Sequence, residues 1–347
     1  MLLGDVPFIP ELFLSYQQEL NQNKSGFFRS GIITENAAIS AEFAKGGRTI
    51  TIPHFSDLAG DSEILSDTVG LTANVLGGNF QIGVRNLRGK SWQSSDLAAE
   101  MAGDDPMRAI AIRTGEYWVR DTQAVMISIL NGIFGPADLS GAIGATHAIG
   151  DVAAPTVINA DSMIDAIALL GDAGQDLSAV AMDSTTYYKL VKDDLIIPGT
   201  SPAATEAQID TRVSAERAEF GTYLGRPVIV DDGLAPTGDR VDGGEDADGN
   251  DVDLHRVYFF APGAMVYSEV APKTPIETDR DVLRGIEFLV NRKEYLLHPI
   301  GLSCEGTFAG NAPTNAEYAT VGTWTKSFSD NRNIKITCLQ GQLVPGA

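Results

Sequence analysis

Positive charge is scarce in this sequence. It has 25 Lys and Arg residues against 46 Asp and Glu, which gives a formal net charge of −21. A protein that binds nucleic acid through its surface needs an excess of Lys and Arg to contact phosphates, so the composition argues against that class. The same shortage argues against binding to an anionic membrane surface.

Long apolar runs and cysteines are also few. No window approaches the roughly 18 consecutive apolar residues that a membrane-spanning helix needs. The first residues have neither a basic segment nor a long apolar core, so no signal peptide is expected. The two cysteines, Cys304 and Cys338, are interpreted as small buried hydrophobic residues rather than a disulfide. The chain has 347 residues, of which 44% are hydrophobic. This length and composition predict a large globular core and two or three lobes.

Catalytic motifs are missing as well. The sequence has no HExxH, GxSxG, CxxC or Walker pattern, and Gly141, Gly144 and Gly150 do not have the spacing of a phosphate loop. His298, inside an apolar strand pattern, and the pair Asp231 and Asp232 leave one hydrolase hypothesis open. We favour a hydrogen-bonded structural imidazole, because no nucleophile lies beside His298 in the sequence. We therefore expect no enzyme and no cofactor.

Residues 231–253 form the most acidic run of the chain. Within it, residues 246–251 superficially resemble a calcium loop, but the Glu that closes such a loop and the flanking helices are absent. A solvated turn between two strands is the favoured interpretation, since charge runs usually stay hydrated. A calcium-binding surface protein that uses residues 246–253 remains an alternative, and no metal site is predicted.

The sequence does contain the pattern of one long helix. Asp105 is a good N-cap, and Pro106 fits the first helical position, where its missing N–H costs nothing. Apolar residues then recur at helical spacing on two faces over residues 106–131. Gly132, Gly135 and Pro136 are expected to end the helix. Two apolar faces predict that this helix packs against elements on both sides.

Residues 1–44 are interpreted as an N-terminal arm. Residues 10–20 can form a short amphipathic helix, whereas residues 21–40 have no firm period. Phe27, Phe28, Ile32 and Ile33 are apolar residues that such an arm would bury on another lobe or another subunit. An ordinary loop packed on its own core is the equally weighted alternative.

Residues 48–92 are predicted to be extended. Residues 49–53 alternate, and residues 71–76 and 80–86 flank Gly77-Gly78-Asn79, which is a hairpin signal. Phe80, Ile82 and Val84 place one apolar face on this ribbon. Because an isolated ribbon is marginally stable and the neighbouring sequence offers no further strands, it should pack on the body or on a neighbouring chain.

After the long helix the pattern is mixed. Asp161 is expected to cap a helix over residues 162–170, residues 179–182 read as a strand, and Asp183 should cap a helix through residue 191. Further strands are predicted at residues 227–230, 257–260, 286–290, 295–303 and 333–339. This is a lobe of ordinary domain size followed by returning strands.

The order of these segments resembles the major capsid protein fold of tailed bacteriophages. Short strings in the same order support it: SxWxSxDLAxxxAGDDPMxxI from residue 91, YWVRDTQ from 117, LNGIF from 130, TYLGRPVIVDD from 222, FFAPGAM from 259, YLLHPIG from 295 and APTNAEYATVGTW from 312. They are similar to strings in a subgroup of phage major capsid proteins. The acidic residues 239–253 and the sequence of the arm match nothing comparable.

The resemblance implies an α+β capsid fold. Its parts would be an N-terminal arm (residues 1–45), an extended β-ribbon loop (46–95), a spine helix with the start of a peripheral domain (96–155), an axial domain (156–255) and return strands of both domains (256–347).

The implied function is structural. Identical copies, arranged in hexameric and pentameric capsomers, would assemble into an icosahedral head that encloses double-stranded DNA without sequence-specific binding. The protein would be located in the virion and assembled in the cytoplasm of the bacterial host, with portal, scaffolding or decoration proteins as candidate partners. An encapsulin-like nanocompartment shell, which shares the fold, is the alternative.

Contacts between subunits are expected from the arm and the ribbon. The ribbon cations Arg85, Arg88 and Lys90 should pair with acidic residues such as Asp57, Asp61 or Glu63, although exposed ion pairs are worth only about 0–1 kcal/mol each. The expected contact residues are Phe27, Phe28, Ile32, Phe80, Ile82, Val84, Arg85, Arg88, Lys90 and Trp92.

Overall fold

A computed structural model describes residues 27, 30–58, 60–65, 67–68, 70–96, 106–136, 138–150, 156–196, 221–234 and 253–343. The helix expected at residues 10–20, the N-cap Asp105, Phe28 and the calcium-like residues 246–251 lie outside these residues. In the part of the chain that the structure describes, no helix combines the length and apolar character needed to cross a bilayer.

The long helix is α5, Pro106–Phe134, with 29 residues, or about 43 Å of axis. It ends where Gly135 adopts a φ of +83° and its N–H donates to the Asn131 carbonyl at 2.8 Å, which is a glycine helix stop. Gly132 lies inside the helix instead of ending it. A Cβ on Gly132 would lie 2.0 Å from the Tyr318 carbonyl oxygen, so Gly132 permits close packing of α10 (Asn315–Ala319).

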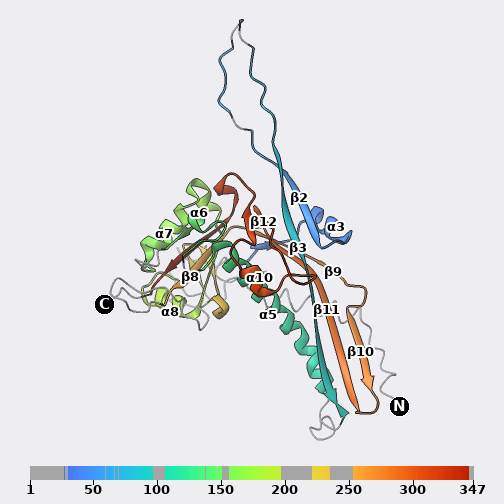
Figure 1. Cartoon of the computed structure of the whole chain (residues 1–347). Coiled ribbons are helices and arrows are strands. Elements are labelled where there is room, and N and C mark those ends of the chain that lie inside the picture. The colour runs from blue at the N-terminus through green and yellow to red at the C-terminus, as the bar shows by residue number, and fades with distance from the viewer. Residues whose placement is uncertain are drawn as a thin grey trace, which may run out of the picture.

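Two six-stranded sheets lie on either side of this helix (Figure 1). The first, here called the arm sheet, has the order β1-β9-β11-β3-β2, with β10 paired to β11. Its strands are β1 Ile33–Thr34, β2 Thr49–Phe55, β3 Gly78–Ser95, β9 Met265–Val270, β10 Ile276–Asp281 and β11 Ile286–Pro299. Except for the β1–β9 pair, which is parallel, the neighbours in this sheet are antiparallel.

The second sheet, here called the lobe sheet, has the order β4-β14-β8-β5-β7-β6. Its strands are β4 Ala148–Ile149, β5 Ala179–Met182, β6 Thr222–Tyr223, β7 Arg226–Val230, β8 His255–Phe260 and β14 Ile336–Gly341. Alternate residues of a strand face opposite sides. Val257 and Phe259 of β8 accordingly belong to the core under α7 (Ala160–Ala168) and α8 (Ser184–Lys192), whereas Tyr258 and Phe260 belong to the core that contains α5.

The remaining elements are short. They are α3 Ala37–Ala44, α6 Gly144–His147, β12 Leu302–Cys304, β13 Trp324–Lys326 and the 3₁₀ turns Gly171–Asp176, Asp232–Leu234 and Asn331–Asn333. The helix α3 falls partly in residues 21–40, for which no period was predicted, and Asn36 caps it by accepting from the N–H groups of Ala38 and Ile39.

Several local predictions are confirmed. Strand β5 has the predicted bounds, and Asp183 caps α8. For α7 the predicted cap is wrong: Asn159, not Asp161, forms the cap, and its side chain and that of Ser162 bond reciprocally to each other's backbone. The two strands predicted at residues 286–290 and 295–303 are one continuous strand, β11, followed by β12.

The predicted hairpin between residues 71–76 and 80–86 is wrong. Residues 78–84 of β3 pair with β2, from Thr49↔Val84 to Phe55↔Gly78, and residues 85–95 pair with β11. The ribbon therefore does have a further strand to join, β11, which is far away in the sequence.

Candidate functional site

Residues 56–77 connect β2 to β3, and the described ones among them (56–58, 60–65, 67–68 and 70–77) extend far from the rest of the molecule (Figure 1). We call them the projecting loop. Its apolar side chains are open to solvent: Leu58 is 80% exposed, Ile64 95% and Val75 94%. Monomeric soluble proteins rarely expose a group of large apolar side chains of this kind unless it serves as a contact surface.

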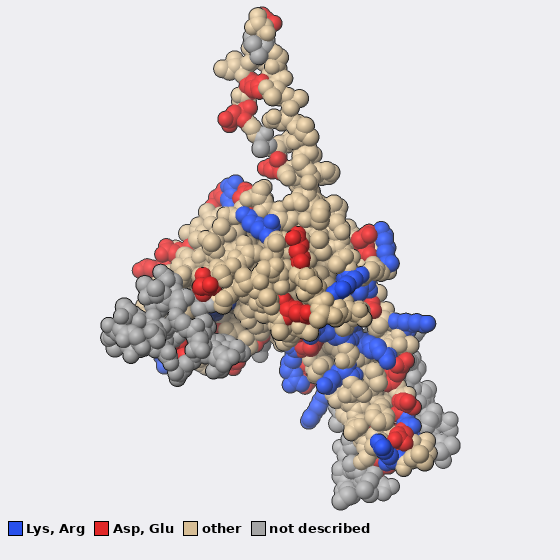
Figure 2. Space-filling model, viewed as in Figure 1, with Lys and Arg blue, Asp and Glu red and all other residues tan. Residues whose placement is uncertain are grey.

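The projecting loop is acidic throughout. It contains Asp57, Asp61, Glu63 and Asp67 and no Lys or Arg, and Figure 2 shows only acidic charge along it. Glu63 accepts a 2.9 Å hydrogen bond from the Thr72 N–H on the other leg of the loop. Hydrogen bonding from Thr72 lowers the pKa of Glu63, which favours its charged form.

The base of the loop is fixed to the body by polar contacts. The Ile82 N–H donates to the Ser303 hydroxyl at 2.9 Å, and the Ser327 hydroxyl donates to the Phe80 carbonyl at 3.0 Å. The ring of His54 meets that of Phe328 edge-on at 4.9 Å between centroids. These contacts from distant segments set the direction in which the loop leaves the body.

Four of the expected contact residues are buried inside the chain itself. Phe27 (1% exposed), Ile32 (0%) and Val84 (3%) belong to the main core. The prediction that such residues need a neighbouring subunit is therefore wrong for these three. Phe27 meets Phe260 edge-on at 6.3 Å between ring centroids, because β1 pairs with β9 and brings the start of the arm onto the core.

Arg85 is the fourth buried residue. Its guanidinium pairs with Glu294 at 2.8 Å, donates to the Phe43 carbonyl at 2.5 Å and lies 4.2 Å from the centre of the Phe43 ring. Arg85 thus joins β3, β11 and α3 within one subunit. Arg85 pairs with an acidic residue, as expected, but the partner is Glu294 and not Asp57, Asp61 or Glu63.

The other expected contact residues lie nearer the surface. Phe80 is 51% exposed, Ile82 is half-buried, and Trp92 is half-buried with its ring edge-on to Tyr117 at 5.3 Å between centroids. Arg88 donates to the Asn315 side chain at 2.7 Å and lies 3.6 Å from Asp121, so its pairing with loop acids is also wrong within one subunit. Lys90 is exposed, and its side chain forms no ion pair or hydrogen bond with any described residue.

Two surface hollows adjoin this part of β3. One, of about 360 Å³, lies between β3, α5 and residues 312–315, and its walls include Arg88, Tyr117 and Asp121. The other, of about 450 Å³, is lined by residues 87–91 of β3, by residues 290 and 292–294 of β11, and by Pro272. Figure 2 shows a gathering of Lys and Arg on this lower part of the body.

The proposed hydrolase residues do not form a catalytic group. His298 is 1% exposed in β11, and its Nε2 lies 3.3 Å from the Gln81 side-chain oxygen. Burial lowers the pKa of His298 to about 4. Asp231 accepts from the Gly233 N–H and Asp232 from the Ser184 N–H, both in the lobe, so neither contacts His298 among the described residues. No group of three His, Cys, Asp or Glu side chains suited to a metal ion occurs among those residues either.

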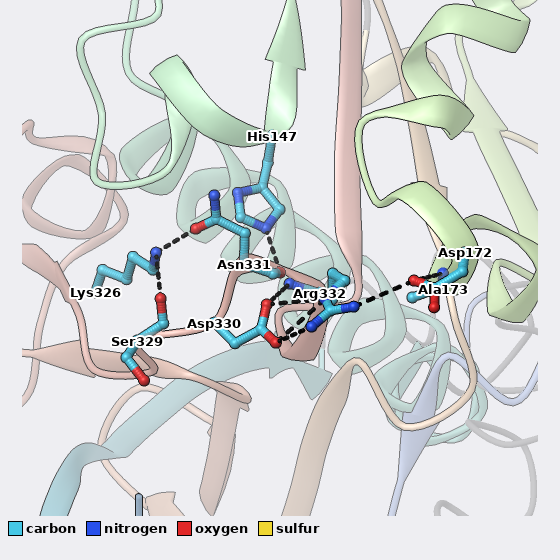
Figure 3. A network of polar contacts seen from close by, with 8 residues as sticks. All are labelled: His147, Asp172, Ala173, Lys326, Ser329, Asp330, Asn331 and Arg332. Atoms are coloured by element: carbon cyan, nitrogen blue, oxygen red, sulfur yellow. Dashed lines mark hydrogen bonds and ion pairs between the residues drawn. The ribbon is translucent and has the colours of Figure 1, made fainter. Parts of the chain in front are cut away.

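Sequence reasoning missed a polar junction at the edge of the lobe (Figure 3). His147 Nε2 faces the Asn331 carbonyl at 2.8 Å, which makes Nε2 the donor, so Nδ1 accepts from the Thr146 hydroxyl at 2.7 Å. Burial lowers the pKa of His147. Arg332 pairs with Asp330 at 2.9 Å and with Asp172 at 3.5 Å. These contacts join residues 326–332 to the lobe, but no local sequence signal marks them.

Comparisons with known proteins agree over most of the chain. A model of the family described as major capsid protein 13-like (Gp13-like) matches residues 121–335. The major capsid protein of Bacillus phage SPP1 is 34% identical over 344 residues, which are 98% of each chain.

Solved structures with a similar fold are also capsids. The capsid of Ralstonia phage GP4 has a TM-score of 0.59 at 11% identity, over 92% of this chain and 89% of that chain. The capsid asymmetric unit of cyanophage Pam1 has a TM-score of 0.59 at 10% identity, over 93% of both chains. At this level of identity these two matches concern the fold alone.

Proposed function

Because the chain belongs to the Gp13-like major capsid protein family, we propose that its copies form the hexameric and pentameric capsomers of an icosahedral phage head. The protein is a major capsid protein with the α+β fold of tailed-phage capsids, a structural component of the virion. Identical subunits of this family build capsid shells. The proposal adds the capsomer arrangement and the contacts that hold it together.

The observation that carries the proposal is the projecting loop. Its apolar side chains remain exposed while the rest of the molecule buries a large core. Burying apolar surface yields about 25 cal/mol per Å², so contact of the loop with another copy would stabilise an assembly repeated many times over. Phe80, Ile82, Lys90 and Trp92 of β3 remain the proposed contact residues next to the loop.

The acidic surface supports a role as a container for DNA. A net charge of −21 repels a packaged polyanion and leaves it free of the wall, whereas a basic wall would bind it. We therefore propose that the shell encloses double-stranded DNA without reading its sequence and has no enzymatic role. Assembly would occur in the cytoplasm of the bacterial host, with portal, scaffolding or decoration proteins as further partners.

Electron microscopy and sedimentation of the purified chain test this function. We expect closed shells or capsomers, and the fraction of the protein in these assemblies should increase with protein concentration. A monomer that persists at high concentration, with residues 56–77 folded onto its own body, would contradict the proposal. The content of particles made during infection distinguishes a phage head, which holds DNA, from an encapsulin-like shell, which holds protein cargo.

A further inference from the structure

Residues 327–335 connect β13 to β14, and we call them the strap. At one end, β13 pairs with β12, whose Ser303 is bonded to Ile82 of β3 near the base of the projecting loop. At the other end, β14 is an inner strand of the lobe sheet. The strap therefore leads from the base of the projecting loop to the lobe.

The strap contacts both legs of the loop at their base. On the β3 leg, the Asn79 side-chain amide donates to the Ser327 carbonyl at 3.3 Å, and the Ser327 hydroxyl donates to the carbonyl of Phe80. On the β2 leg, the ring of His54 meets the ring of Phe328 edge-on. A change in the direction of either leg therefore displaces the first residues of the strap.

The far end of the strap is held to the lobe by opposite charges. Arg332 lies 3.5 Å from Asp172, and Lys335 lies 3.4 Å from Asp176. Both acids belong to the 3₁₀ turn 171–176, which follows α7, and Figure 3 shows Arg332 reaching toward Asp172. The four side chains are exposed, so each pair contributes little by itself and can be removed without disturbing the core.

A buried bond lies beneath these ion pairs. His147, which is 1% exposed, donates from Nε2 to the Asn331 carbonyl at 2.8 Å, and the Ile334 N–H donates to the same carbonyl at 3.0 Å. The Ala261 N–H donates to the Lys335 carbonyl at 3.1 Å. Moving the strap alone would leave the buried His147 donor without its acceptor, which costs free energy. The strap and the lobe are therefore expected to move together.

We propose that the strap couples the direction of the projecting loop to the position of the lobe, so that a displacement of one shifts the other. The strap has nine residues and is bonded at both ends, so it has little slack, and such a continuous set of contacts can carry coupling between distant parts of a protein. Capture of the loop by another copy would then shift the lobe, a consequence that rests on the proposed function.

Removing the charges at the lobe end tests the coupling at the loop end. Asp172→Asn with Asp176→Asn keeps the shape of both side chains and removes both ion pairs. In unassembled subunits, we expect the amides of residues 78–82 at the base of the loop to exchange hydrogen about fivefold faster than in the parent chain. Hydrogen exchange followed by mass spectrometry measures these rates, because residues 78–82 and the substituted turn lie on different peptides.

A matched pair of acids on α7 provides the control. Asp161→Asn with Asp165→Asn makes the same change in net charge at two exposed positions of the lobe. Residues 78–82 should exchange in this variant as they do in the parent chain. Equal exchange at residues 78–82 in the parent chain, the control and the Asp172/Asp176 variant would overturn the coupling.

The reverse experiment starts at the loop end. Ser327→Ala removes the hydroxyl that holds the Phe80 carbonyl. Because coupling between two sites is reciprocal, exchange of the amides of residues 171–176 should rise by a similar factor. A rise confined to the base of the loop would contradict the proposal.

Spin labels measure the direction of the loop itself. Ile64→Cys and Lys192→Cys place labels at exposed positions of the loop and of α8, and the two native cysteines are buried. Electron paramagnetic resonance should find a broader distance distribution between the labels when Asp172 and Asp176 are replaced by asparagine, and the parental distribution in the control. An unchanged distribution in both would show that the strap does not set the direction of the loop.

The two proposals fail separately, because these measurements use unassembled subunits. If the parent chain forms no shells, the proposed function is at fault, whatever the strap variants show. If the parent forms shells while exchange and label distances are the same in all variants, the capsid function stands and the coupling through the strap is wrong.

Discussion

The start of the arm and the projecting loop look alike in the sequence but differ in the structure. Both are segments with large apolar residues and little local periodicity, and both were expected to need a neighbouring copy. Phe27 and Ile32 are at most 1% exposed in the main core, whereas Ile64 is 95% exposed. Apolar content alone therefore does not decide whether a segment is buried by its own chain.

The difference lies in what pairs with each segment. Residues 31–34 meet β9 through parallel pairing at Ile33↔Met265 and through the Met265 N–H, which donates to the Ile32 carbonyl at 3.2 Å. Between the legs of the loop, the Ser56 N–H donates to the Gly77 carbonyl at 2.9 Å at the base, and the Thr72 N–H donates to the Glu63 carboxylate further out. A segment with a backbone partner is held against the core, and one without a partner remains available to another molecule.

The largest effect on the isolated subunit should come from Phe27→Ala. Truncating a fully buried phenylalanine leaves a cavity, so we expect the free energy of unfolding to fall by about 4 kcal/mol. Urea unfolding of unassembled subunits measures it. Phe80→Ala makes the same chemical change at a side chain that is 51% exposed, and its cost should stay below about 1 kcal/mol. Similar losses in the free energy of unfolding for the two variants would contradict the distinction between the buried start of the arm and the exposed base of the loop.

Gly132→Ala should come next. The added Cβ would lie 2.0 Å from the Tyr318 carbonyl and 2.8 Å from Trp324 Nε1, so α5 and α10 must separate at a cost of about 3 kcal/mol. Asn131→Ala, one residue away on the exposed side of the same helix, is the control and should be nearly neutral. A stable Gly132→Ala variant would mean that α10 can move away from α5 without loss.

How much of the fold the sequence could predict depends on how far apart in the sequence the interacting residues lie. Asp183 with the helix after it, strand β5 and the stop at Gly135 are local features, and their patterns predicted them. The pairing of residues 78–84 with β2, and of residues 85–95 with β11, joins segments whose side chains do not specify a partner. Glycine is also the residue that commonly ends a helix. Only the close approach of the distant Tyr318 explains why Gly132 lies inside the helix.

The proposed contact surface was predictable in part for the same reason. The ribbon as a region was identified, and Lys90 and Phe80 remain candidates within it. Arg85 could not be separated from Lys90 by sequence, since its partners Glu294 and Phe43 come from distant elements.

Acid should destabilise the core around His298. Burial lowers the pKa of His298 to about 4, against about 6.5 in the unfolded chain. The unfolded state therefore binds more protons between these values, and stability present above pH 6.5 is lost as the pH falls toward 4, by up to about 3 kcal/mol. Unfolding measured against pH should show this slope in the parent chain and a smaller one in His298→Gln. Identical slopes in the parent chain and in His298→Gln would assign the acid sensitivity to other groups.

The smallest effect on the isolated subunit should come from Ile64→Ser, and for that reason it is the sharpest test of the comparison. A side chain that is 95% exposed has almost no apolar contact to lose, so the free energy of unfolding should change by less than about 0.5 kcal/mol. In assembled shells the same change removes apolar burial between copies, and the melting temperature of the shell should fall. Scanning calorimetry of both states makes the measurement. If the subunit loses stability and the shell does not, the loop is packed by its own chain, and the contrast with the arm is reversed.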